Sequence, residues 1–139
     1  MLSSPLIQTT LLHYLSLIPI FAYSHVKNQR LYSGYAVIIT LSSTLSTVWH
    51  YMGEPDNEWL VADYYAAAMW GIYNIILVER IEHALLARVI YLECMILAMN
   101  HSIDYCVRKK LVNYVDWHSC WHVASATKSL YISYLLCSR

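Results

Sequence analysis

Long apolar runs separated by short polar segments dominate this chain. Five runs approach the roughly 20 residues that span a bilayer as one helix, and Gly and Pro, which interrupt helices, number only three each. We therefore predict an all-α fold, a polytopic transmembrane helix bundle that forms a single integral membrane domain over residues 1–139. The predicted spans cover roughly residues 6–24, 31–51, 59–78, 83–100 and 112–136.

The segments between the predicted spans differ in charge. A basic loop at residues 25–30 follows the first span, an acidic loop at 53–58 follows the second, and a charged turn at 79–82 follows the third. The distribution of Lys and Arg weakly favours the side opposite the acidic loop as cytoplasmic, with the N-terminus outside. The predicted loop at 101–111 carries basic residues on the other side and weakens this orientation. The first run lacks a small-residue cleavage site, so we expect an uncleaved helix.

The composition supports a multi-pass membrane protein. Hydrophobic residues make up 58% of the chain and charged residues 13%, about half the share usual in soluble domains. The formal net charge of zero gives no reason to expect a nucleic-acid partner. The cysteines form no C-x-x-C pair, so we expect thiols that pack as small hydrophobic residues rather than a metal or disulfide role. They are Cys94, Cys106, Cys120 and Cys137.

His118 and His122, near the start of the last run, carry the strongest chemical signal. Residues four apart lie on one side of a helix, one turn from each other. Paired helix histidines at this spacing bind one metal ion in zinc enzymes. Because two imidazoles inside a membrane segment are costly without a partner, the pair indicates a functional site. Cys120 lies about 200° around the helix from both and is poorly placed to join them.

Other polar groups are predicted to reach the same membrane depth. His50 ends the second span and Ser46 lies one turn before it, whereas Asp63 follows the acidic loop at the start of the third. The fourth span returns the chain to that side, so His118 and His122 begin the fifth span at the same end. With one membrane crossing more or fewer between Asp63 and His118, these groups would lie on opposite sides of the membrane. The topology therefore predicts three histidines, a carboxylate and a hydroxyl at one end of the bundle.

These residue types together indicate metal-dependent hydrolysis. Three His ligands with an open fourth position are typical of a catalytic zinc site, where zinc lowers the pKa of its bound water to about 7. Asp63 is a candidate to act as general base or to hold that water. Ser46 is a candidate to polarise a substrate carbonyl or to support the developing oxyanion. The predicted cofactor is Zn²⁺.

The remaining histidines are expected to be packed or hydrogen-bonded residues rather than ligands. This applies to His13, His25 and His83. His101 and Asp104 lie near the predicted site, but we do not assign them to it. The predicted metal site therefore consists of His50, His118 and His122.

Charged and aromatic residues inside the spans need partners or an interface. Arg88 and Glu93 are costly in the fourth span, and we expect them to line a polar cavity or to meet partners on other helices. Trp117 and Trp121 are expected to be interfacial anchors rather than substrate platforms.

The pattern Ser46-x-x-x-His50, Asp63 and His118-x-x-x-His122 resembles the signature of the CREST superfamily of membrane hydrolases. This group includes the alkaline ceramidases, the progestin and adiponectin receptors (PAQR) and the transmembrane protein 8 and myomaker group, of which the last looks most similar. Further similar landmarks are Leu17-Ile18-Pro19-Ile20 followed by Lys27 and Arg30, Val48-Trp49-His50, Asp63-Tyr64-Tyr65 and Tyr114-Val115. Only the His, Asp and Ser pattern is specific.

The resemblance implies roles for individual residues. His50, His118 and His122 would bind zinc, Asp63 would hold or activate the water, and Ser46 would assist at the substrate carbonyl. The implied enzyme hydrolyses an amide or ester bond in a membrane lipid, with ceramide or acylated glycerolipid as candidate substrates. Family members usually have seven helices, and this chain is shortened to about five. The missing pair would fall between the third and fifth spans, which leaves all ligands at one end, and a second copy of the chain is a candidate to complete the bundle.

Two other functions fit the same residues. A non-enzymatic protein of this type would keep a structural metal and act in membrane fusion, remodelling or reception. A bis-histidine haem protein would hold haem between helices, but Asp63 and Ser46 would then have no evident role.

Overall fold

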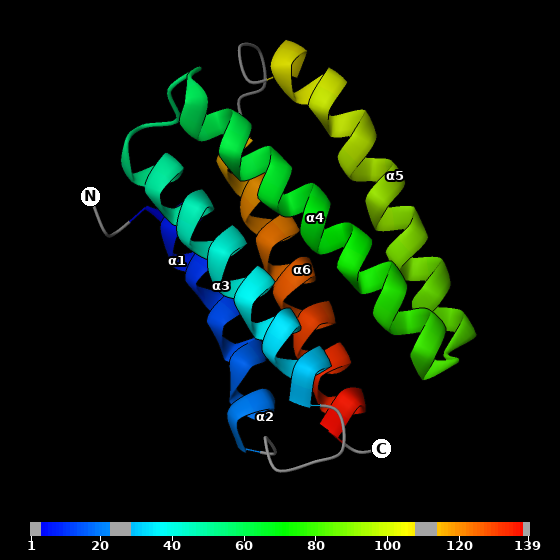
Figure 1. Ribbon diagram of the computed structural model, residues 1–139. Helices are drawn as coiled ribbons and strands as arrows, with labels where there is room; N and C mark the ends of the chain where they lie inside the picture. The colour runs from blue at the N-terminus through cyan, green and yellow to red at the C-terminus, as the bar shows by residue number, and fades with distance from the viewer. Residues whose placement is uncertain (1–3, 23–28, 108–113, 138–139) are drawn as a thin grey trace.

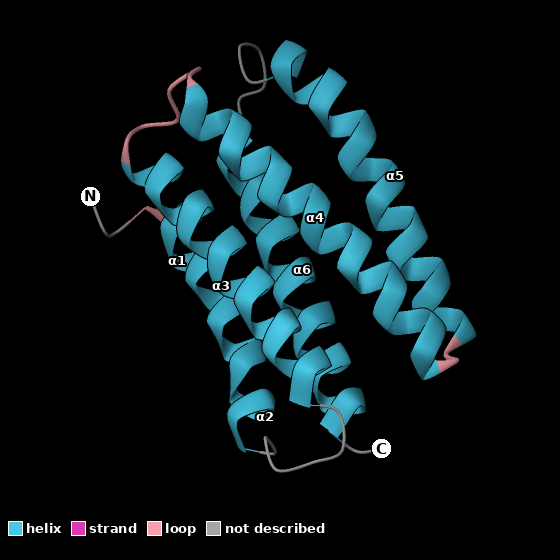
Figure 2. Ribbon diagram, in the orientation of Figure 1, coloured by secondary structure: helices cyan, strands magenta, loops and turns pink. Residues whose placement is uncertain are grey.

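The described part of the chain consists of helices joined by short turns (Figure 2). The computed structural model describes residues 4–22, 29–107 and 114–137. The predicted all-α fold is confirmed. The elements are α1 (Pro5–Leu11), η1 (Leu12–Ser16), α2 (Leu17–Ala22), α3 (Gln29–Tyr51), α4 (Glu58–Ile81), α5 (Ala84–Val107) and α6 (Tyr114–Cys137).

The first predicted span is a continuous run of α1, the 3-10 helix η1 and α2. Pro5 occupies the first turn of α1 after the Ser4 cap, where its missing N–H costs nothing. Pro19 lies within α2, where it removes the hydrogen bond that would reach back to Leu15 and crowds that carbonyl. The 3-10 segment ends at Ser16, three residues before Pro19, and its tighter winding accommodates the defect.

The turn between α4 and α5 ends one helix and begins the next within two residues. Glu82 adopts a left-handed conformation with a φ of 53°, and its N–H donates to the Val78 carbonyl over 3.1 Å. His83 Nδ1 then accepts from the Leu86 N–H over 3.2 Å and so caps α5. The prediction that His83 is a hydrogen-bonded residue and not a ligand is consistent with this position.

The predicted end of the fourth helix was wrong. A loop was expected from residue 101, but α5 continues to Val107. The segment at 101–107 contains polar residues but neither Gly nor Pro, so nothing in it breaks the helix. The basic cluster at 108–110 lies outside the described residues.

The helices form a bundle in which α5 lies at one edge. The first span packs along α6 and also contacts α3, while α3 packs against α4 (Figure 1). α5 packs chiefly against α4, the helix that precedes it. The N-terminal end of α6, the C-terminal end of α3 and the N-terminal end of α4 lie at the same end of the bundle.

Small residues allow the close approach of α6 to its neighbours. Ser125, Ser129 and Ser133 repeat every four residues along the buried side of α6. Small residues at this spacing let helix backbones approach closely in membrane bundles. The Ser16 hydroxyl donates to the Ala126 carbonyl over 3.3 Å, which ties η1 to α6 at this contact.

Polar residues face inward and large apolar residues face outward. Buried polar residues include Ser42, Asn74 and Ser129, whereas Phe21, Tyr65 and Leu85 are each about two-thirds exposed or more. This distribution suits a protein surrounded by lipid, where polar groups line the bundle interior. Among the residues that the structure describes, three helical segments are long and apolar enough to cross a membrane: Pro5–Ala22, Arg30–Tyr51 and Glu58–Arg80. Five crossings therefore remain a prediction.

Candidate metal centre

The end of α3 is shaped to hold His50 and a carboxylate together. Gly53 has a φ of 83°, a left-handed conformation that Gly adopts without strain. The Gly53 N–H donates to the His50 carbonyl over 3.2 Å, and the Glu54 N–H donates to the Trp49 carbonyl over 3.0 Å. This pair of bonds is a Schellman motif, which satisfies the last carbonyls of a helix while reversing the chain. The reversal brings Glu54 back beside His50.

Glu54 orients the His50 ring. One Glu54 carboxylate oxygen, Oε1, lies 2.9 Å from His50 Nδ1 and accepts its hydrogen. His50 then presents the lone pair of Nε2 to the interior of the bundle. Metal-binding histidines usually donate their second N–H to a carboxylate or carbonyl in this manner. Sequence reasoning missed Glu54, because Gly53-Glu54-Pro55 indicates a turn and only the spacing of four from His50 signals the contact.

The structure brings the three predicted histidines together. His50 Nε2 and His122 Nε2 are 3.1 Å apart, and one ligand atom from each of His50, His118 and His122 lies within 4.8 Å of the others. Two nitrogen ligands of one tetrahedral zinc are separated by ~3.3 Å when each Zn–N bond is ~2.05 Å. The predicted convergence is therefore present, and the three imidazoles can hold one metal ion.

The two histidines of α6 lie in its second and third turns. Their ring centres are 4.7 Å apart, and His50 lies 5.1 Å from His118 and 5.3 Å from His122 by the same measure. His122 is buried and His118 is half-buried. The pair thus faces the bundle interior from one helix, as the spacing of four predicts.

Thr10 on α1 completes the surroundings of His122. Its hydroxyl donates to the Leu6 carbonyl over 2.7 Å and lies 3.2 Å from His122 Nε2. The first span therefore supports the metal centre from behind, a contact that sequence reasoning did not find.

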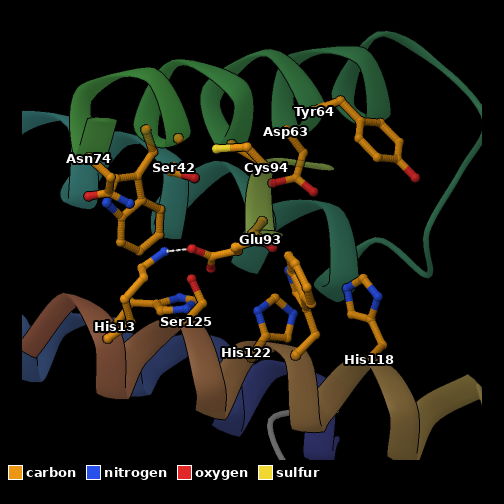
Figure 3. A pocket seen from close by; sticks show the side chains of 16 residues that line it. His13, Ser42, Asp63, Tyr64, Asn74, Glu93, Cys94, His118, His122 and Ser125 are labelled. Carbon is orange, nitrogen blue, oxygen red and sulfur yellow. Dashed lines mark hydrogen bonds and ion pairs between the residues drawn. The ribbon is translucent and has the colours of Figure 1, made fainter. Parts of the chain in front are cut away.

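Asp63 and Ser46 lie next to the histidines, as predicted. The Asp63 carboxylate interacts with the Ser46 hydroxyl. Both residues line a cavity whose wall also includes His118 and His122 (Figure 3). A water or carbonyl group in this cavity would meet the carboxylate and the histidines from opposite walls.

The cavity is narrow and extends along α4 and α6. Its volume is about 90 Å³, room for roughly six to nine waters at ~10–15 Å³ each. On α4 its lining runs from Asp63 to Asn74, and the eleven steps between these two residues rise about 16 Å. On α6 it runs from His118 to Lys128. A space of this shape suits a reactive group followed by a segment of one chain.

Residues outside the predicted site also line the cavity. Trp121 lines the cavity, and its predicted role as an interfacial anchor stays a prediction. His13 packs edge-on against Trp70 with ring centres 5.0 Å apart, as expected of a packed residue, yet it also lines the cavity. Glu93 lines the cavity as predicted and pairs with Lys128 of α6. Lys128, missed in the sequence, is signalled by its charge within a long apolar run.

The remaining predictions concern residues away from the cavity. Cys120 is exposed on α6, in agreement with its exclusion from the histidine set. Arg88 is exposed on α5. His25 lies outside the described residues, as do the side chains of His101, Asp104, Cys106 and Trp117.

Comparison with known proteins found no matching family model, no similar curated protein and no similar solved structure. The resemblance to the CREST superfamily thus depends on the residues themselves and stays a prediction.

Proposed function

We propose that this chain is an integral membrane hydrolase that uses zinc to cleave an amide or ester bond in a lipid. The observation that carries the proposal is the meeting of His50, His118 and His122, with ligand atoms within 4.8 Å of one another. Two of them, His118 and His122, line a cavity together with Asp63. Three imidazoles beside an open space match a catalytic site more closely than a closed structural one.

The donor set fits zinc. Imidazole nitrogen suits Zn²⁺ among the common biological metals, whereas Ca²⁺ and Mg²⁺ prefer oxygen ligands. His50, His118 and His122 would hold the ion, with Glu54 fixing the orientation of His50. When bound, zinc would supply a Lewis acid and a water of lowered pKa at neutral pH.

The protein's own side chains would carry the proton and orient the carbonyl. A carboxylate oxygen of Asp63 accepts a proton from water that enters the cavity and later returns it to the leaving group. The Ser46 hydroxyl, one turn before His50, donates a hydrogen bond to the carbonyl oxygen of the bond to be cleaved. The buried walls exclude bulk water, which strengthens both interactions.

The surroundings favour a lipid as the substrate. Three of the helices are apolar enough to lie within a membrane, and α3 and α4, which carry His50 and Asp63, are among them. The narrow cavity admits a carbonyl group and a chain segment rather than a folded protein. Ceramides and acylated glycerolipids contain the amide and ester bonds that this chemistry would cleave.

Metal analysis of purified protein tests the first half of this proposal. Mass spectrometry of the detergent-solubilised wild type should find about one zinc per chain. His50→Ala should lose it, whereas Cys120→Ser, on the exposed side of α6, should keep it. Absence of zinc from the wild type would refute the proposed centre.

Lipid turnover tests the second half. Wild-type protein should release fatty acid from a ceramide or glycerolipid in mixed micelles, and Asp63→Asn should reduce release by about 10²- to 10⁴-fold while keeping zinc. Zinc without turnover of any lipid, together with indifference to Asp63→Asn, would favour the non-enzymatic alternative with a structural metal.

The haem interpretation does not fit the observed distances. Axial histidines bind haem iron from opposite faces of the macrocycle. His50 Nε2 and His122 Nε2 are 3.1 Å apart, and the His118 ring lies beside both. No porphyrin can pass between nitrogens at that separation in this arrangement.

A further inference from the structure

A second polar group lies farther along the cavity than the three histidines. The Lys128 ammonium on α6 forms an ion pair with the Glu93 carboxylate on α5, and their side chains are only 9% and 18% exposed (Figure 3). Lys128 Nζ also lies 5.7 Å from the centre of the Trp70 ring. Lys128 follows His122 by six residues, so its backbone lies about 9 Å farther along the helix axis.

The buried Lys128–Glu93 ion pair contributes little net stability to the contact between α5 and α6. Burying two charges costs desolvation that their attraction only partly returns, and apolar side chains of similar size often stabilise a protein as well or better. Ionisable groups inside membrane bundles accordingly mark ligand or ion sites more often than packing contacts. Both residues line the cavity, so a ligand within it would touch them.

Asn74 adds an acceptor to the same wall. Its side chain is 1% exposed, and its amide oxygen has no hydrogen-bond partner among the described residues. Buried polar atoms in native proteins are almost always paired, and each exception needs an explanation. Because Asn74 lines the cavity, a hydrogen-bond donor on a ligand would supply the missing partner.

The chemistry of the three residues selects the ligand group. The Lys128 ammonium has three donors and gives one to Glu93, so it can still donate to an acceptor in the cavity. Asn74 requires a donor. The Lys128–Glu93 pair is neutral, so a charged ligand group would introduce an uncompensated buried charge. A hydroxyl accepts from Lys128, donates to Asn74 and adds no charge.

We propose that Asn74, Lys128 and Glu93 form a subsite that binds a hydroxyl group on the hydrocarbon chain of the lipid substrate. The inference deepens the proposed function and rests on it, because it places the scissile carbonyl at the histidines. The substrate class is then an amide or ester whose chain carries a hydroxyl about 9 Å from the carbonyl, near the middle of a long fatty chain.

Binding of two matched neutral lipids tests the subsite without turnover. Stearamide and the same amide with one hydroxyl near mid-chain are titrated in detergent into the zinc-loaded full-length protein carrying Asp63→Asn, which should cleave amides too slowly to disturb the titration. Turnover is measured on the protein that retains Asp63. We expect the hydroxylated amide to bind about tenfold more tightly, the effect of one hydrogen bond to a charged group. Equal affinities, a preference for stearamide, or no binding of either amide would overturn the proposal.

Two variants separate recognition from packing. Asn74→Leu and the double replacement Glu93→Leu with Lys128→Met should retain the fold and bind the two amides equally, since an apolar pair can replace a buried ion pair. Arg88→Met, on the exposed side of α5, should keep the preference. If both subsite variants still bind the hydroxylated amide more tightly, whatever their thermal stability, the Lys128–Glu93 pair has only a structural role and the proposal is refuted.

The same preparations distinguish failure of the subsite from failure of the proposed function. Zinc content and release of fatty acid from ester and amide substrates are measured beside the affinities. Turnover without tighter binding of the hydroxylated amide would refute the subsite but not the proposed hydrolase function. A hydroxyl preference without zinc or turnover would remove the hydrolase and leave a lipid-binding cavity.

Discussion

The carboxylate of Glu54 should control how tightly the chain holds zinc. Its oxygen accepts the Nδ1 hydrogen of His50 over 2.9 Å in a half-buried position. Loss of such an outer partner typically weakens metal binding by about 10- to 100-fold. Glu54→Gln keeps an acceptor oxygen but removes the charge, so we expect a loss of about tenfold, equivalent to ~1.4 kcal/mol. Glu54→Ala removes both and should approach 100-fold.

Competition with a chromophoric chelator measures this effect. The purified variants are titrated with chelator, and the zinc dissociation constants are compared with that of the wild type. Glu58→Gln is the matched control, because Glu58 is an exposed acid four residues away and its loss changes the net charge equally. Equal weakening in both Gln variants would assign the effect to the charge of the acidic loop. Unchanged affinity in Glu54→Ala would refute the orienting role.

Further expectations concern the ligands, the base, the thiol and the packing of α6. His118→Ala or His122→Ala should reduce zinc to near zero by mass spectrometry, and a full complement in either would remove that residue from the site. Asp63→Asn should keep zinc and reduce turnover by about 10²- to 10⁴-fold; parallel loss of zinc would make Asp63 a ligand. Cys120→Ser should alter neither, and lost zinc would overturn its exclusion. Ser133→Leu should overpack the fully buried α6 contact and destabilise the fold by about 1–3 kcal/mol, which thermal unfolding in detergent would show.

Much of the architecture could be predicted because apolar runs determine where membrane helices lie. The spacing of four placed His118 and His122 on one side of α6, and counting the crossings placed His50 at the same end. These inferences need only helix periodicity and chain direction. The end of α5 was missed because polarity alone does not end a helix.

The details of the centre depended on geometry that no local pattern contains. Glu54 meets His50 only because Gly53 turns left-handed and reverses the chain there. Thr10 meets His122 across 112 positions of sequence, and Lys128 meets Glu93 through the rotation of two helices about their axes. Such contacts depend on how the helices dock, which the order of residues along one helix does not specify.

The separation of the ligands along the chain has a consequence for biogenesis. His50 belongs to the second span, but its partners His118 and His122 belong to the last, 72 positions separating His50 from His122. During synthesis the nascent chain can insert most of its helices before a complete ligand set exists. Because metal affinity usually arises only with the folded state, zinc uptake would be a late event that reports docking of the final helix. A chain truncated before α6 would then insert into the membrane but could not retain metal. Its helix bundle would lack α6 and would be exposed to quality-control proteases.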